Sequence, residues 1–157
     1  MDKNKQIKQK YPMGMKLILI MLGGGTLILL FSLFKTPVAQ FGPVLLTGSA
    51  AVFVNIIVIG ILSAIFYGVL KRLEWGRKLA IYWYSFSMLL SLVNFISFIS
   101  NKTMYDNFYQ KILTPEVYAV MTTEIIVIGF IQGLIFGCII GITIILYLIK
   151  KKDFFVK

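Results

Sequence analysis

Four long apolar stretches constrain the fold of this chain more than any other feature of its sequence. They cover residues 17–34, 43–70, 79–99 and 125–149, and none of them contains a charged residue. About 20 apolar residues in a helix cross the hydrocarbon core of a bilayer, and each stretch approaches or exceeds that length. Lipid offers the backbone no hydrogen bonds, so a spanning segment must pair its own polar groups. The sequence therefore predicts transmembrane helices.

The segments between these stretches are too short to fold into a separate soluble domain. We therefore predict a single membrane domain over residues 1–157, an all-α integral membrane four-helix bundle with up-down topology. Its predicted spans are about 16–34, 43–70, 79–99 and 124–149. Pro43 is expected to open the second helix, because proline suits the first helical position.

The basic residues are distributed unequally around the predicted spans. The chain has 16 Lys and Arg residues, and all except Lys35, Lys102 and Lys111 flank the spans on one side. Short cytoplasmic loops are enriched in Lys and Arg, so we expect both termini in the cytoplasm of a cell-membrane protein. The same residues would attract anionic lipid headgroups. These two roles account for the net charge of +10 without nucleic acid.

One segment between the third and fourth spans has the pattern of an amphipathic helix. Tyr105, Phe108, Tyr109 and Ile112 recur at helical spacing among polar residues. We expect a short interfacial helix there, with its aromatic face toward lipid. Trp75, in the short basic turn between the second and third spans, is a further predicted interfacial anchor.

The turn Trp75-Gly76-Arg77 is followed by Leu79-Ala80-Ile81. With the spacing of the spans, this segment resembles small prokaryotic four-transmembrane-helix proteins of unknown function. The resemblance implies the layout of the chain and no activity or functional residue.

Small residues recur at intervals of four in two of the predicted helices. In lipid, such stripes let helix backbones approach closely. The sequence permits two interpretations: packing of the fourth helix against the second within one molecule, which we favour, or a seam for self-association or gating. The stripes consist of Gly129, Gly133, Gly137 and Gly141 in the fourth helix, and of Gly60, Ala64 and Gly68 in the second.

Three amide side chains, those of Asn55, Asn94 and Gln132, fall inside predicted spans. Their similar depths predict one hydrogen-bonded intramembrane polar cluster. Such contacts usually fix the register of packed helices. A polar cavity for a small ligand is the alternative.

Reactive groups are scarce in the sequence. It has no histidine, one cysteine (Cys138) and six acidic residues that form no paired motif. We therefore predict no catalytic, metal or cofactor-binding residues.

Packing devices are abundant, so the leading hypothesis is a non-enzymatic membrane protein that acts through helix–helix contact. It would be an accessory, assembly or self-associating subunit with a protein partner or a second copy in the membrane. A small permease or channel using the polar cluster is the alternative, and an enzyme comes third.

Overall fold

The computed structural model describes residues 11–35, 37–112, 114–120 and 123–155. Its long helices are α2 (Met13–Ser32), α3 (Gly48–Leu70), α4 (Glu74–Ser100) and α7 (Thr123–Lys150). Within the described residues, these four helices are long and apolar enough to cross a membrane. The shorter elements are β1 (Val38–Phe41), β2 (Val44–Thr47), α5 (Lys102–Ile112), α6 (Pro115–Val120) and the 3-10 helix η1 (Lys152–Phe154).

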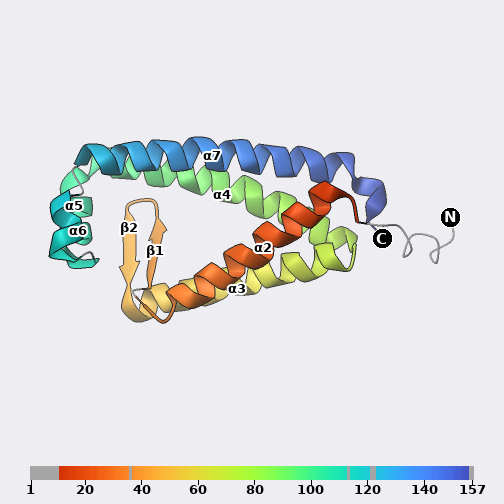
Figure 1. Ribbon diagram of the computed structural model, residues 1–157, viewed down its shortest axis with the longest axis horizontal. Coiled ribbons are helices and arrows are strands. Elements are labelled where there is room, and N and C mark those ends of the chain that lie inside the picture. Colours follow the sequence, from red (N-terminus) through yellow and green to blue (C-terminus); the bar gives the residue numbers. More distant parts are fainter. Residues whose placement is uncertain (1–10, 36, 113, 121–122, 156–157) are drawn as a thin grey trace.

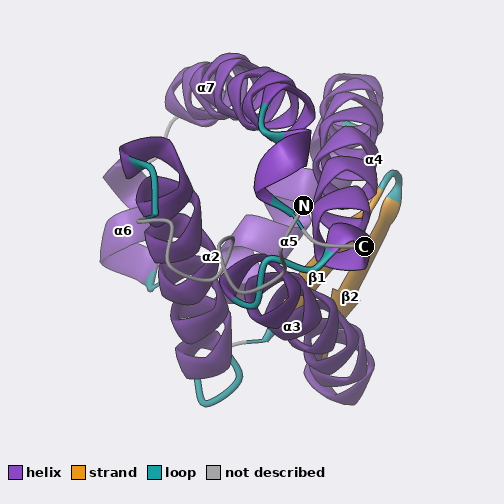
Figure 2. Ribbon diagram, turned by 90° about the vertical axis from the view of Figure 1, so that its right-hand side faces the viewer, coloured by secondary structure: helices purple, strands orange, loops and turns teal. Residues whose placement is uncertain are grey.

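The long helices are arranged in the sequence order α2, α3, α4 and α7. Helix α7 lies antiparallel to α4, α4 packs on α3, and α3 packs on α2 (Figures 1 and 2). The described chain begins and ends at the same end of the molecule, which we call the terminal end. The opposite end carries β1, β2, α5 and α6, and we call it the hairpin end (Figure 1).

The helices converge at the terminal end around an apolar core. All four long helices and the segment after α7 contribute buried side chains to it. These are Met15, Ile18, Leu22, Ile65, Val69, Ala80, Ile144, Leu148, Phe154 and Phe155. Gly68 and Gly76 let α3 and α4 approach closely there, since a Cβ added to Gly68 would lie 2.5 Å from the Cα of Gly76.

A β-hairpin lies where the sequence predicted the first turn of the second span. Strands β1 and β2 pair antiparallel, with Phe41 opposite Val44, across the loop Gly42-Pro43. The predicted helix start at Pro43 is therefore wrong, and α3 begins at Gly48. Gly42 has φ +56°, as the first central position of a type II′ turn requires. A short apolar run next to a long one does not distinguish strand from helix by periodicity.

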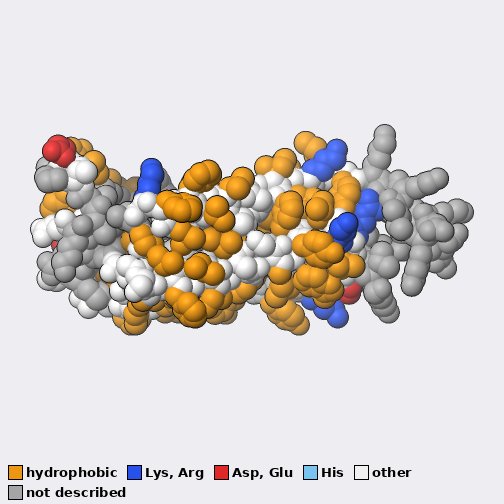
Figure 3. Space-filling model, turned by 90° about the horizontal axis from the view of Figure 1, so that it is seen from below, with side chains coloured by type: hydrophobic (Ala, Val, Ile, Leu, Met, Phe, Trp, Pro, Cys, Tyr) orange, Lys and Arg blue, Asp and Glu red, His pale blue; other side chains and the backbone are white. Residues whose placement is uncertain are grey.

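The molecular surface separates apolar from charged residues along the bundle. Hydrophobic side chains cover the middle of the face in Figure 3, and Lys and Arg side chains gather toward the terminal end. Large apolar side chains are more than half exposed on every long helix, among them Ile20, Phe53, Leu89 and Leu146. Soluble proteins rarely expose so much continuous apolar surface. Such a surface, over four helices that are long and apolar enough to cross a membrane, is typical of a multi-pass membrane protein.

The close approach of α3 and α4 gives a stability prediction. The change Gly68→Ala should lower the free energy of unfolding in detergent by about 1–3 kcal/mol, because the methyl group overpacks the contact. Gly60→Ala is the matched control, since no atom lies within 4 Å of a Cβ added there. Equal thermal unfolding of the two variants would contradict the role of Gly68.

Candidate functional site

Two of the three amides predicted to lie inside spans hold the backbone of the hairpin. Asn94 of α4 accepts a hydrogen bond on Oδ1 from the backbone N–H of Gly42, with an N–O distance of 2.6 Å. Asn55 of α3 donates from Nδ2 to the carbonyl oxygen of Val38 at 3.4 Å. The hairpin is therefore tied to both neighbouring helices, and its polar backbone finds partners among apolar side chains.

Gln132 does not belong to this group. Its side chain is exposed on α7 and makes no hydrogen bond within the described part of the chain. The predicted three-amide cluster is therefore only partly formed. Depth alone brought Gln132 into the prediction, whereas hydrogen bonding also requires that the side chains point toward one another.

Gln40 of β1 and Tyr105 of α5 complete the polar contacts around the hairpin, and this pair was not predicted from the sequence. Gln40 Nε2 donates to the hydroxyl of Tyr105, and that hydroxyl lies 3.4 Å from the carbonyl oxygen of Gly42. Desolvation raises the pKa of Tyr105 above its ordinary value. The hydroxyl is therefore protonated at neutral pH and can donate to Gly42 while accepting from Gln40. The sequence feature that could have indicated this contact is Gln40 itself, a single polar residue among apolar ones beside the Gly42-Pro43 turn.

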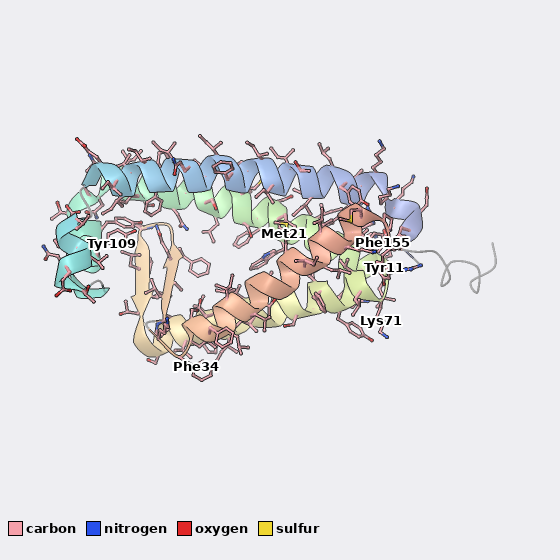
Figure 4. The ribbon with its side chains drawn as sticks, in the orientation of Figure 1. Tyr11, Met21, Phe34, Lys71, Tyr109 and Phe155 are labelled. Carbon is pink, nitrogen blue, oxygen red and sulfur yellow. The ribbon has the colours of Figure 1, made fainter. Side chains whose placement is uncertain are left out.

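Helix α5 forms where the amphipathic pattern predicted a helix, but Tyr105 is not a lipid-facing anchor. Its side chain is 1% exposed and packs edge-on against Phe98 of α4 at a centroid distance of 5.0 Å. Phe98 in turn stacks on Phe130 of α7 at 4.4 Å. Tyr109 packs against this aromatic cluster at the hairpin end (Figure 4). The side chain of Phe108 lies outside the described residues.

The glycine stripe of α7 does not pack against α3. Helix α7 packs mainly on α4, and the favoured interpretation of the stripe is therefore wrong. Of its members, Gly141 faces Met88, whose Sδ would lie 2.9 Å from an added Cβ. Within the described part of the chain, no atom outside the local helix backbone lies within 4 Å of the Cβ position at Gly129, Gly133 or Gly137. We call these three residues the open glycine face.

The stripe of small residues on α3 (Gly60, Ala64 and Gly68) also has one member in a close helix contact and one in open space. Gly68 contacts α4 through Gly76, whereas the Cβ position of Gly60 is open. Ala64 is partly buried. This stripe therefore contributes to the contact of α3 with α4 at the terminal end, and in the described structure it does not form the predicted packing surface for α7.

A groove of about 500 Å³ lies between α4 and α7 beside the open glycine face. Gly129 and Gly133 line it on α7, and Ser91 and Asn94 line it on α4. A second cavity, of about 310 Å³, lies between β1, α3 and α4. Ser91 and Asn94 line both spaces, so the two adjoin along one face of α4.

The terminal end holds a cation between aromatic rings. The guanidinium carbon of Arg72 lies 4.5 Å from the ring centroid of Tyr11 and 4.4 Å from that of Phe154. Tyr11 also donates a hydrogen bond to the carbonyl oxygen of Leu70. Tyr11, Phe155 and Lys71 lie at this end in Figure 4. Trp75 is 47% exposed in the first turn of α4, as an interfacial residue would be.

The described residues contain no group of three or more His, Cys, Asp or Glu side chains that could hold a metal ion. Glu74 is paired with Arg77, with an oxygen–nitrogen distance of 2.6 Å. Cys138 is a free, partly buried thiol on α7. The notable groups of the site are therefore amides, hydroxyls, aromatic rings and bare glycine backbone.

The hairpin contacts predict a local effect of one hydroxyl. Tyr105→Phe removes one of three acceptors of Gln40 Nε2, which also lies 3.3 Å from the carbonyl oxygen of Gly42 and 3.5 Å from that of Asn94. The change should destabilise the hairpin end by about 0.5–1.5 kcal/mol, the net contribution of one hydrogen bond. Hydrogen exchange measured by mass spectrometry should become faster over residues 38–47. The control is Tyr82→Phe, at a side chain that is 70% exposed. Unchanged exchange in Tyr105→Phe would contradict this role.

Comparisons with models of protein families, with curated proteins and with solved structures found no match. The geometry described above is therefore the basis for the function proposed below.

Proposed function

We propose that this chain is a non-enzymatic multi-pass membrane protein that acts through helix–helix packing. In this proposal the open glycine face of α7 receives a transmembrane helix of a partner protein or of a second copy. The observation that carries the proposal is the empty space around Gly129, Gly133 and Gly137. The chain would act as an accessory, assembly or self-associating subunit.

The cost of glycine supports this proposal. Each glycine in a helix interior costs about 1 kcal/mol relative to alanine in water. Gly68 and Gly76 offset that cost through a close contact inside the molecule. The open glycine face has no such contact among the described residues, and in our proposal a helix from outside the chain supplies it. In lipid, a helix that packs on bare backbone gains van der Waals contacts and weak hydrogen bonds.

The groove beside this face suits the side chains of a docked helix. It is lined by apolar residues of α7, such as Ile126 and Leu134, and by Ser91 and Asn94 of α4. A partner helix carrying small and polar residues would therefore find both backbone contact and hydrogen-bonding groups.

A small permease or channel is less well supported, because it requires a polar route between the two ends of the bundle. The apolar core around Met15, Leu22 and Ile65 fills the terminal end of the described structure. Asn94 and Asn55 are also engaged with the backbone of the hairpin. A solute pathway would have to open that core.

Association in lipid tests the proposal. Gly133→Leu should weaken self-association or partner capture about tenfold or more, since overpacking a contact costs about 1–3 kcal/mol. Single-molecule photobleaching in nanodiscs measures the copies per particle, and mass spectrometry of proteins extracted with the tagged chain identifies a different partner.

Gly60→Leu is the matched control, because the Cβ position of Gly60 is also open but lies on α3, outside the open glycine face of α7. Equal losses in the two variants would indicate a general effect on the bundle. A wild-type chain that is monomeric in lipid and extracts without a partner would refute the proposal.

The orientation we propose places the terminal end in the cytoplasm, beside anionic headgroups. Lys71, Lys78, Lys150 and Lys152 are exposed there, and each would contribute about 1 kcal/mol near an anionic surface. Epitope tags at the two termini should both resist protease in intact cells and be cleaved after permeabilisation. Cleavage of either tag in intact cells would contradict this orientation.

A further inference from the structure

The cavity between β1, α3 and α4 is lined by polar side chains and aromatic rings together. Gln40, Asn55, Ser87, Ser91 and Asn94 supply the polar groups. Trp83 and Phe86 form part of its apolar wall, with their ring centroids 6.2 Å apart. Its volume of about 310 Å³ falls at the lower end of the range for small-molecule sites, about 300–1,000 Å³.

Several polar groups around this cavity have no partner within the described chain. Asn94 uses Oδ1 to bind Gly42, and its Nδ2 donates no hydrogen bond there. The hydroxyl of Ser87 likewise makes none. Asn55 is 6% exposed and has one hydrogen bond, from Nδ2, which leaves its Oδ1 without a donor. These atoms are accessible rather than enclosed, since no buried side-chain nitrogen or oxygen among the described residues lacks a partner. They are therefore available to an occupant with hydrogen-bonding capacity.

The lining residues define the chemistry of this occupant. None of them is Lys, Arg, Asp or Glu, so a charged ligand would be desolvated without a counter-charge. The unused donors at Asn94 and Ser87 each call for an acceptor oxygen, and Trp83 and Phe86 call for an apolar or planar body. The cavity is too small for a helix, whose diameter with side chains is about 10–12 Å.

We propose that this cavity binds a neutral, lipophilic molecule with two carbonyl oxygens, one of which accepts a hydrogen bond from Asn94 Nδ2 and the other from Ser87 Oγ. The two donors lie seven residues, or about 10 Å, apart along α4, so a separate oxygen is needed for each. The apolar part of the molecule packs against Trp83 and Phe86. Two classes of membrane-dissolved molecule carry this chemistry: the two ester carbonyls of a glycerolipid and the two ring carbonyls of a quinone. The site does not require the helix contact proposed for the open glycine face.

The two tryptophans of the chain, Trp75 and Trp83, allow a direct test. The full chain carrying Trp75→Phe retains Trp83 as its fluorophore. Menadione, a naphthoquinone, and dioctanoylglycerol, a diester, are titrated separately into this protein in nanodiscs. We expect a saturable change in Trp83 emission with at least one probe. The Trp83→Phe protein, which reports from Trp75, should show only a non-saturating change.

Ser87→Ala in the Trp75→Phe background removes one donor without breaking a hydrogen bond in the described chain. It should raise the dissociation constant about fivefold, as expected for the loss of one hydrogen bond. Ser63→Ala is the matched control, at an exposed serine of α3 outside the cavity.

Saturation by menadione alone assigns the site to quinones, and saturation by dioctanoylglycerol alone assigns it to lipid esters. Saturation by both supports the shared carbonyl chemistry. If neither probe saturates, or if Ser87→Ala and Ser63→Ala bind alike, the proposal is overturned. The copies per particle, measured on the same nanodiscs, report separately on the helix contact.

Discussion

The hydrogen bond from the Gly42 N–H to Asn94 Oδ1 allows a β-hairpin to lie between helices that are otherwise apolar. A strand exposes polar backbone groups along its edges, and hydrocarbon cannot pair them. Asn55, Gln40 and Tyr105 supply further partners. With the hairpin in place, the long helices are joined at the terminal end by their apolar core, and at the hairpin end the strands contact α3 and α4.

The hairpin also shortens α3. A helix over residues 43–70 would measure about 42 Å, beyond a hydrocarbon core of about 30 Å. Helix α3 has 23 residues, which corresponds to about 35 Å at 1.5 Å per residue. It is therefore shorter than α4 and α7, which have 27 and 28 residues. The strands contact α3 and α4 at that end, beside the cavity that β1, α3 and α4 line.

The sequence predicted the long helices well because length and uniform hydrophobicity determine them. It also predicted helix α5, since Tyr105 and Tyr109 recur at helical spacing. The hairpin was missed because Val44–Thr47 is as apolar as the helix that follows it. The partners of individual side chains could not be deduced, since they depend on how each helix is rotated about its axis. Rotation places Asn94 on the hairpin and Gln132 on the surface, although the two were predicted at similar depths. Tyr105, which was predicted to face lipid, lies instead in an aromatic cluster.

The contact of Arg72 with Tyr11 and Phe154 joins three parts of the chain that are far apart in the sequence. Tyr11 lies before α2, Arg72 lies in the turn between α3 and α4, and Phe154 lies in η1 after α7. One guanidinium group therefore holds the segments outside the first and last long helices against the central turn. Loss of this single cation would loosen all three segments together.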